Sequence, residues 1–157
     1  MPSLPDAYQP CPVARAADVI GDRWSLLIVR DVFDGQHRFG DLQRGLGMAR
    51  NILADRLRRL VEAGVLDTRP ASDGSAYLEY VLTERGEELF PVIVALRQWG
   101  ERQLFDEGEP HSLLVDTQRG QPLPYMAPKD SRGYVLEPAQ AIVRKLPVGA
   151  AEGCDPA

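Results

Sequence analysis

The sequence has little of the chemistry that most enzymes and metal proteins need. Only two cysteines and two histidines occur among its 157 residues, and the cysteines stand at opposite ends of the chain. Such spacing provides neither a disulfide framework nor an ordinary zinc site. The patterns G-x-S-x-G, G-x-x-x-x-G-K-[ST] and H-E-x-x-H are all missing. The sequence therefore predicts that the protein is not an enzyme and carries no metal or other cofactor.

Long apolar runs and a leader segment are also missing. No run approaches the roughly 20 apolar residues of a membrane-spanning helix. The first ten residues do not combine a basic start with an apolar core. With 44% hydrophobic and 26% charged residues, the composition is typical of a folded soluble protein. We expect a cytoplasmic protein that does not contact a membrane.

Negative charge is in excess over the whole chain but not along its middle. The formal net charge is −5, yet residues 36–59 hold six arginines against two aspartates. This stretch carries +4, so the remainder carries −9. A basic patch on an acidic body is typical of local phosphate contact, because binding depends on the facing surface rather than on net charge.

Two short helices joined by a tight turn are predicted within this basic stretch. Apolar residues recur every three or four positions along Phe39–Leu46 and again from about Arg50 to Ala63. Gly45 and Gly47 interrupt the first helix, since glycine turns a chain most easily. Gly64 stands where a C-terminal glycine cap belongs.

The outward face of the second helix carries residues suited to reading DNA bases. Arg50, Asn51, Asp55 and Arg58 lie on this face, and Asn51 is the only asparagine in the chain. Arginine with guanine and asparagine with adenine are pairings that the geometry of the major groove favours. A solvated amphipathic helix is the competing interpretation, and this helix alone does not separate the two.

The elements on either side complete a winged helix-turn-helix pattern. We expect helices at Pro12–Ile20 and Arg23–Phe33. The second is apolar on all sides, which predicts that it lies at the centre of the core. Alternating residues at 65–69 and 77–82 predict a two-stranded hairpin, the wing.

A long helix and a β-rich tail are predicted after the wing. Thr83 caps the helix, which runs to Leu104 and is kinked at Pro91. Its two apolar stripes exceed what one small domain can cover, so we expect it to pair with the same helix of a second copy. Short extended pieces then form a small β-rich extension.

The predicted fold class is α+β and mainly α: a winged helix-turn-helix with a long C-terminal dimerisation helix and a small β-rich C-terminal extension. The winged domain with its dimerisation helices is expected to cover residues 11–105, and the extension residues 111–147. Residues 1–10 and 148–157 are expected to be disordered.

Short motifs in the order of a known family run from Cys11 to Arg102. They are Cys11-Pro12, Gly21-Asp22-Arg23-Trp24, Arg38-Phe39, Asp41-Leu42, Ile52-Leu53, Arg56-Leu57, Leu60, Gly64, Glu79-Tyr80, Leu82-Thr83, Gly86, Leu89, Pro91, Leu96 and Trp99-Gly100. In this order the motifs resemble the HxlR-type winged helix-turn-helix transcriptional regulators, relatives of the MarR group. The resemblance implies a homodimer on a palindromic operator, with recognition helices roughly 34–36 Å apart.

The resemblance also implies a role for individual residues. Base reading falls to Arg50, Asn51, Asp55 and Arg58. Phosphate contact falls to Arg38, Arg56 and Arg69. The wing departs from a typical basic wing at Asp73, which weakens the prediction that it contacts DNA.

Cys11 is the candidate for a redox sensor. A thiol just before a helix that opens with Pro12 lies at the positive end of the helix dipole, which favours the thiolate. The resemblance suggests sensing, because several relatives use a cysteine at this position. Most free cysteines simply pack as small hydrophobic residues, however, and no second cysteine lies nearby in the sequence. We therefore favour packing.

The expected function is that of a DNA-binding transcriptional regulator that acts on double-stranded DNA and responds to a small molecule or a redox signal. A small-molecule effector would lie between the winged domain and the dimerisation helices. Its pocket could be lined by Tyr8, Trp24, Phe33 and Trp99. The alternative is a protein-binding winged helix, in which the second helix of the unit faces a partner protein and reads no DNA.

Overall fold

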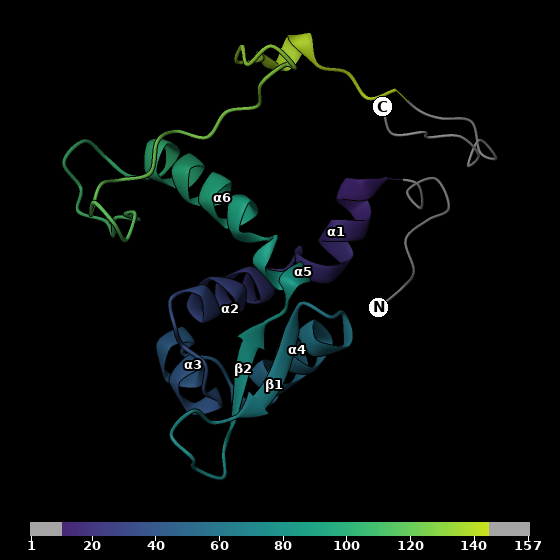
Figure 1. Cartoon of the computed structure of the whole chain (residues 1–157), viewed down its shortest axis with the longest axis vertical. Helices are drawn as coiled ribbons and strands as arrows, with labels where there is room; N and C mark the ends of the chain where they lie inside the picture. The colour runs from purple at the N-terminus through teal and green to yellow at the C-terminus, as the bar shows by residue number, and fades with distance from the viewer. Residues whose placement is uncertain (1–10, 145–157) are drawn as a thin grey trace. The chain divides into compact units, whose positions relative to one another are not determined.

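The computed structural model describes residues 11–144 of the chain (Figure 1). The chain divides into two compact units, one that reaches His111 and one that begins at Ser112. The disorder expected at residues 1–10 and 148–157 lies outside the described residues. Within the described range, every helix is too short or too polar to cross a lipid bilayer.

The first two helices begin and end where the sequence predicts. α1 spans Pro12–Ile20 and α2 spans Arg23–Phe33. The missing N–H of a proline does no harm in the first turn of α1, because that N–H would have no partner within the helix. The carboxylate of Asp22 accepts hydrogen bonds from the backbone N–H groups of Trp24 and Ser25, at 3.0 and 3.1 Å. Asp22 therefore caps α2.

α2 lies at the centre of the core, as its apolar circumference predicts. It contacts α1, α3, α4, α6 and β2, and Ile28 and Val29 have no exposed surface. Burying a side chain of this size stabilises the fold by about 1.5–3 kcal/mol. The helix-turn-helix supplies four fully buried leucines of this cluster, and β1 supplies Leu66; the four are Leu42, Leu53, Leu57 and Leu60.

α3 (Phe39–Leu46) and α4 (Arg50–Glu62) form the helix-turn-helix. Gly47 ends α3 in the left-handed conformation, at a φ of 61°, which glycine adopts without steric strain. Gly45 lies within α3 and does not interrupt it, contrary to the prediction. Gly64 follows α4 at a φ of 68°, as expected for a C-terminal glycine cap.

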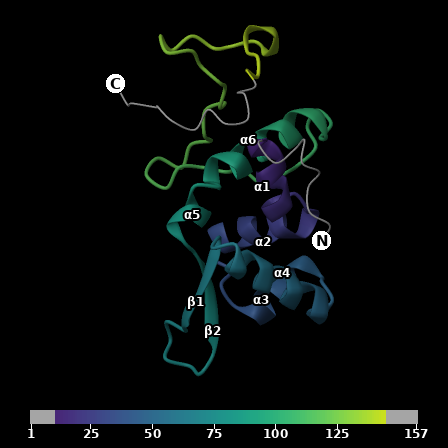
Figure 2. The same ribbon diagram turned by 90° about the vertical axis from the view of Figure 1, so that its right-hand side faces the viewer.

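The wing consists of β1 (Leu66–Pro70) and β2 (Leu78–Leu82), which pair antiparallel. The turn that joins the two strands projects beyond α3 and α4 (Figures 1 and 2). β2 also pairs with the segment just before α3. There the backbone N–H of Tyr80 donates to the carbonyl of His37 at 2.8 Å. The wing and the helix-turn-helix are therefore joined by backbone hydrogen bonds.

The prediction of one kinked helix after the wing is wrong, because the chain forms two helices there. α5 spans Glu84–Glu87 and α6 spans Phe90–Gln103. Thr83 caps α5 as predicted, its hydroxyl accepting from the N–H of Gly86 at 3.1 Å. Pro91 lies in the first turn of α6. A proline lacks the N–H that would continue the earlier helix and clashes with the carbonyl four residues before it, so the chain starts a new helix.

The second unit has less β structure than predicted. In its described part the predicted strands are reduced to two isolated bridges, and a short 3-10 helix follows at Pro138–Gln140. Residues 141–144 form no strand. Asp116 and Asp130 each accept backbone N–H groups from the turns that follow them, so local turns organise this unit. The bridges pair Val115 with Pro122 and Lys129 with Val135.

Gly86 occupies a position where no side chain fits, and this can be tested. A Cβ atom there would lie 2.2 Å from the carbonyl oxygen of Val65. We expect Gly86→Ala to lower the free energy of unfolding by about 1–3 kcal/mol, measured by urea unfolding. In the control Gly40→Ala, the added Cβ would meet only the end of the Arg44 side chain, at 3.7 Å. Equal stability of the two variants would contradict this account of the α5 packing.

Candidate nucleic-acid interface

The first turn of α4 exposes two of the residues predicted to read bases. Arg50 and Asn51 are both exposed. The guanidinium of Arg50 lies 5.2 Å from the centre of the Phe39 ring, and within residues 11–144 no carboxylate pairs with it. Ala49, the residue before the helix, makes no side-chain cap. The first backbone N–H groups of α4 are therefore not occupied by a capping oxygen.

Further along α4, the arginines are held by acids of the same helix. Arg58 donates to both carboxylate oxygens of Glu62, at 2.7 and 2.8 Å, and to Asp55 at 2.6 Å. Arg59 approaches the other oxygen of Asp55 at 2.9 Å. The hydrogen bond from Arg58 lowers the pKa of Asp55, and those to Glu62 and Asp55 raise the pKa of Arg58. Sequence analysis missed Glu62, although its spacing of four residues from Arg58 is a known signal for an ion pair.

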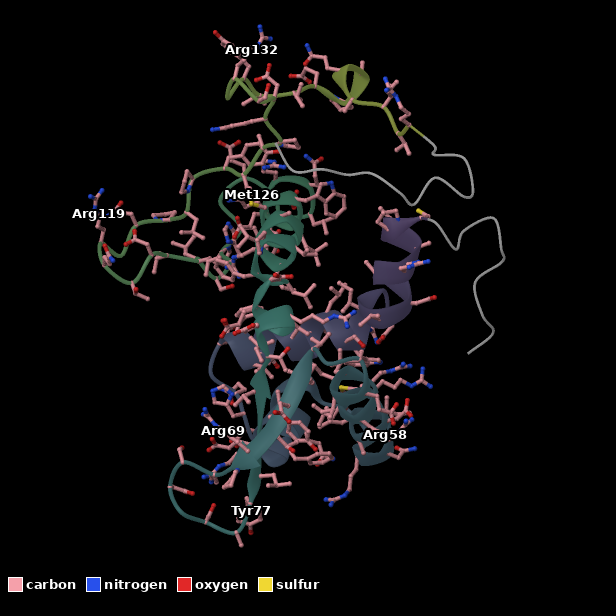
Figure 3. All side chains as sticks on the ribbon, turned by 45° about the vertical axis from the view of Figure 1, so that its right-hand side comes forward. Arg58, Arg69, Tyr77, Arg119, Met126 and Arg132 are labelled. Atoms are coloured by element: carbon pink, nitrogen blue, oxygen red, sulfur yellow. The ribbon has the colours of Figure 1, made fainter. Side chains whose placement is uncertain are left out.

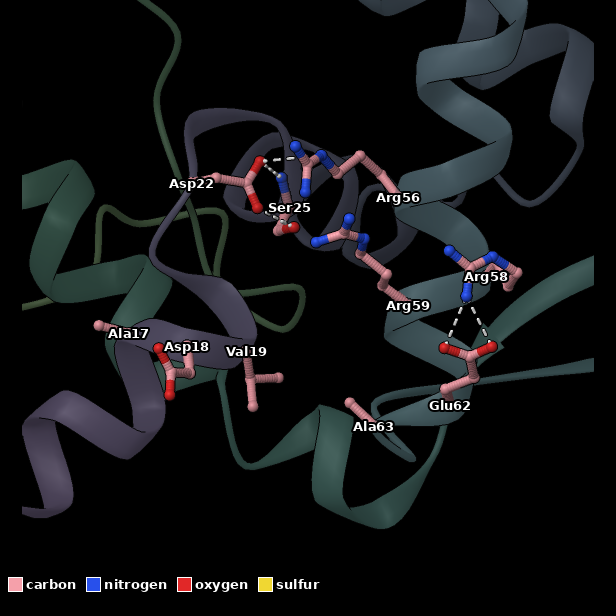
Figure 4. A pocket seen from close by; sticks show the side chains of 10 residues that line it. All are labelled: Ala17, Asp18, Val19, Asp22, Ser25, Arg56, Arg58, Arg59, Glu62 and Ala63. Atoms are coloured by element: carbon pink, nitrogen blue, oxygen red, sulfur yellow. Dashed lines mark hydrogen bonds and ion pairs between the residues drawn. The ribbon is translucent and has the colours of Figure 1, made fainter. Parts of the chain in front are cut away.

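Arg56 lies against α2 and not on the outward face of α4 (Figure 4). Its Nε is 3.6 Å from the carboxylate of Asp22, and 21% of its side chain is exposed. Because Asp22 caps α2, this ion pair connects the start of α2 to the middle of α4. The pair lies at a groove of about 390 Å³. A phosphate contact by Arg56 stays a prediction.

In the wing, Arg38 and Arg69 meet around one buried acid, Glu79. Arg69 lies 3.4 Å and Arg38 3.9 Å from its carboxylate oxygens, and the Ser72 hydroxyl donates to it at 3.2 Å. Burial opposes ionisation of Glu79, but hydrogen bonds from Ser72 and Arg69 outweigh that effect and lower its pKa. Sequence analysis gave Glu79 no part in the site. Arg69 and Glu79 lie opposite each other in the hairpin, so aligning the two predicted strands would have revealed the pair.

Asp73, at the tip of the wing, is bound to Arg38. Its carboxylate accepts a hydrogen bond from the Arg38 guanidinium at 2.5 Å and another from the backbone N–H of Ser75 at 3.0 Å. These hydrogen bonds hold the pKa of Asp73 far below its usual range. The acid that weakens the prediction of a DNA-contacting wing is therefore engaged by one of the predicted phosphate-binding arginines.

Most of the predicted DNA-binding residues fall into two separate groups in the first unit, and Arg56 lies apart from both. Figure 3 shows Arg58 projecting from α4 and Arg69 from the wing. The structure brings Arg38 and Arg69 together at the wing and leaves Arg56 apart from both groups, against α2. The group on α4 consists of Arg50, Asn51, Asp55 and Arg58.

Cys11 is the residue just before α1 and has a half-buried, free thiol. Its carbonyl accepts from the N–H of Arg15 at 3.1 Å. The other cysteine, Cys154, lies outside the described residues, as does Tyr8 of the predicted effector pocket. Cys11 as a redox sensor stays a prediction.

The remaining aromatic residues of the predicted effector pocket lie in different environments. Trp24 and Phe33 are partly buried and pack against the core, whereas 51% of Trp99 is exposed. Trp99 does not share the partly buried environment of the other two, and the pocket stays a prediction.

The central helix α2, the helix-turn-helix of α3 and α4, and the hairpin beside them together define a winged helix-turn-helix transcriptional regulator. The model of the HxlR-like helix-turn-helix family matches residues 19–107, and the chain belongs to this family. The HTH-type transcriptional regulator Rv3095 of Mycobacterium tuberculosis is 49% identical over 106 residues, which are 67% of each chain. The resemblance seen in the sequence motifs is thus confirmed.

Two solved structures extend the comparison. The crystal structure of PA1607, described as a candidate transcription factor, matches with a TM-score of 0.83 and 49% identity, over 90% of this chain and 99% of that one. The redox regulator HypR in its oxidized form matches with a TM-score of 0.53 and 32% identity, over 58% of this chain and 95% of that one. The match to PA1607 therefore extends beyond the winged domain.

The cap and ion pair of Asp22 predict a pH-dependent stability. Burial would raise the pKa of Asp22, but hydrogen bonds from Ser25 and the charge of Arg56 outweigh it and lower the pKa. Stabilisation by this carboxylate is therefore present above its unfolded-state pKa and is lost as the pH falls through the folded-state value. We expect Asp22→Ala to lower the free energy of unfolding by about 0.5–2 kcal/mol at neutral pH.

The measurement is urea unfolding of the wild type and Asp22→Ala between pH 7 and pH 3. The difference between them should begin to shrink below a pH of about 4, where the carboxylate of the unfolded chain becomes protonated. Asp18→Ala is the matched control, because Asp18 lines the same groove but does not cap a helix. It should change the stability by less than about 0.5 kcal/mol. A difference for Asp22→Ala that stays constant with pH would contradict the assignment.

Proposed function

We propose that the protein is a homodimeric, sequence-specific DNA-binding regulator that inserts α4 of each protomer into the major groove of a palindromic operator. The observation that carries the proposal is the exposed first turn of α4, with Arg50 and Asn51 uncommitted to any acid of the described chain. In helix-turn-helix proteins, the N-terminal residues of the recognition helix contact base edges. Membership in a family of transcriptional regulators supports the same conclusion.

Different residues have different parts in this proposal. Arg50 and Asn51 read bases directly, because arginine suits guanine and asparagine suits adenine. Arg58 and Asp55 read bases only after their mutual hydrogen bond of 2.6 Å is exchanged for contacts with DNA. The backbone contacts are assigned to Arg38, Arg56 and Arg69.

The exposed apolar surface of α6 supports a two-fold dimer. A soluble monomer rarely exposes a large contiguous apolar patch. Two-fold pairing through α6 would present two copies of α4 to DNA about one helical turn apart, roughly 34–36 Å. On and just after α6, six large apolar side chains are 40–67% exposed: Phe90, Val92, Leu96, Trp99, Leu104 and Phe105.

The signal is proposed to be a small molecule or an oxidant. One structural neighbour, HypR, is a redox regulator, and Cys11 is the cysteine available in the described chain. The packing interpretation predicts that Cys11→Ser leaves any effect of oxidant on DNA binding unchanged. Loss of that effect in Cys11→Ser, measured by fluorescence anisotropy with hydrogen peroxide, would instead identify Cys11 as the sensor.

DNA reading by α4 can be tested with two substitutions. We expect Asn51→Ala and Arg58→Ala each to weaken binding to the DNA upstream of the protein's own gene by about 5- to 150-fold, the equivalent of about 1–3 kcal/mol per base contact. Binding to a scrambled duplex should change far less. Fluorescence anisotropy at several salt concentrations measures both. Arg85→Ala on α5 is the control for the loss of one exposed arginine.

Wild-type affinity in both α4 variants would contradict the proposal. It would favour the alternative in which α4 faces a protein partner, since such a surface should tolerate the loss of these polar side chains.

The dimer can be tested independently of DNA. Trp99 is 51% exposed in the single chain, and tryptophan is over-represented among residues that dominate protein interfaces. We expect Trp99→Ala to weaken self-association by about 30-fold, the equivalent of about 2 kcal/mol, measured by sedimentation equilibrium. Asn51→Ala should leave the dimer intact. A wild-type protein that is monomeric at micromolar concentration would contradict a dimer built on α6.

A further inference from the structure

Arg38 is held by two acids that differ sharply in exposure. It is the residue just before α3 and also forms a bridge with Glu79 of β2, so it lies where the wing meets the helix-turn-helix. The side chain of Glu79 is 6% exposed, whereas that of Asp73 is 53% exposed. The Arg38 side chain is itself 36% exposed, so solvent can reach it.

The two acids also differ in how firmly they are anchored. Glu79 belongs to a strand and is held by Arg69 and Ser72 as well as by Arg38. Asp73 belongs to the turn between the strands, and besides Arg38 it contacts only the backbone N–H of Ser75 among the hydrogen bonds described. Asp73 can therefore leave Arg38 by a movement of the turn, and Glu79 cannot without disrupting the hairpin.

The contact between Asp73 and Arg38 has the chemistry of a phosphate contact. A guanidinium binds carboxylate and phosphate oxygens through the same short, charge-assisted hydrogen bonds, and here the donor–acceptor distance is 2.5 Å. An exposed ion pair adds little to the stability of a fold. Its exchange for a DNA phosphate is therefore not opposed by a large loss of folding stability.

We infer that Asp73 occupies, in the free protein, the place on Arg38 that a DNA phosphate takes in the complex, so that Asp73 restrains binding to any duplex. The inference rests on the proposed function, in which Arg38 contacts the DNA backbone. The negative charge of Asp73 thereby has a specific role: the acid at the wing tip competes with DNA for one arginine. Glu79 stays with Arg38 in both states.

The test measures binding of the full-length protein to a labelled 30-base-pair duplex of random sequence at several salt concentrations. Asp73→Asn removes the competing charge but keeps a side-chain oxygen for the N–H of Ser75. We expect it to raise the affinity several-fold at each salt concentration, because Arg38 then meets a DNA phosphate without first giving up a carboxylate. In the Arg38→Ala background, Asp73→Asn should have no such effect.

The matched control is Asp67→Asn. Asp67 is an exposed acid of β1 in the same wing, and its carboxylate accepts from the N–H of the adjacent Thr68. The substitution removes the same charge from the wing without releasing Arg38. A gain in Asp73→Asn no larger than in Asp67→Asn, or a gain that persists without Arg38, would overturn the inference and leave the proposed function standing. If the wild type and every variant fail to bind any duplex, the proposed function falls and the inference falls with it.

Discussion

The packing of α2 against five other elements is the constraint on which the rest of the first unit depends. A helix with apolar residues around most of its circumference must be covered on most sides, and α1, α3, α4, α6 and β2 each contact it. α4 is therefore positioned by the same core that stabilises the fold. The ion pair between Asp22 and Arg56 adds a polar connection between the start of α2 and α4. Stability and the geometry of the surface proposed to face DNA are for this reason coupled.

Internal ion pairs moderate the positive charge of the basic stretch. Five of its six arginines pair with acids within the described chain, and Arg50 is the exception. Each paired arginine that contacts DNA must exchange a carboxylate for a phosphate or a base. The chain as a whole is negative, with a net charge of −5, and DNA repels it. Binding is therefore favoured only where several of these exchanges occur together. The five arginines that pair with acids are Arg38, Arg44, Arg56, Arg58 and Arg59.

Signals that lie within a helix itself predicted the helices well. The predictions failed most where the structure depends on contacts between distant parts of the sequence. Pro12 and Asp22 mark helix starts through their own backbone chemistry, so α1 and α2 were predicted to the residue. Pro91 was recognised as a local break, but the break separates two helices instead of bending one. The strands expected in the extension depend on pairing partners that short extended pieces do not identify.

The candidate site, too, has a part that the sequence predicted and a part that only the fold reveals. Helical periodicity is enough to gather Arg50, Asn51, Asp55 and Arg58 on α4. The contact between Arg38 and Asp73 joins residues 35 positions apart, and only the hairpin and its bridge to the segment before α3 bring them together. Glu62 and Glu79 could have been found from helix spacing and strand alignment, whereas the contacts of Arg38 with Asp73 and of Arg56 with Asp22 needed the fold.

Hydroxyl-radical footprinting on the DNA upstream of the protein's own gene tests the central claim most directly: that α4 reads the major groove within a two-fold dimer. The account predicts two protected segments related by two-fold symmetry, with centres about 10–10.5 base pairs apart, and their loss in Asn51→Ala. A single protected segment without symmetry, or a footprint that Asn51→Ala leaves unchanged, would contradict it.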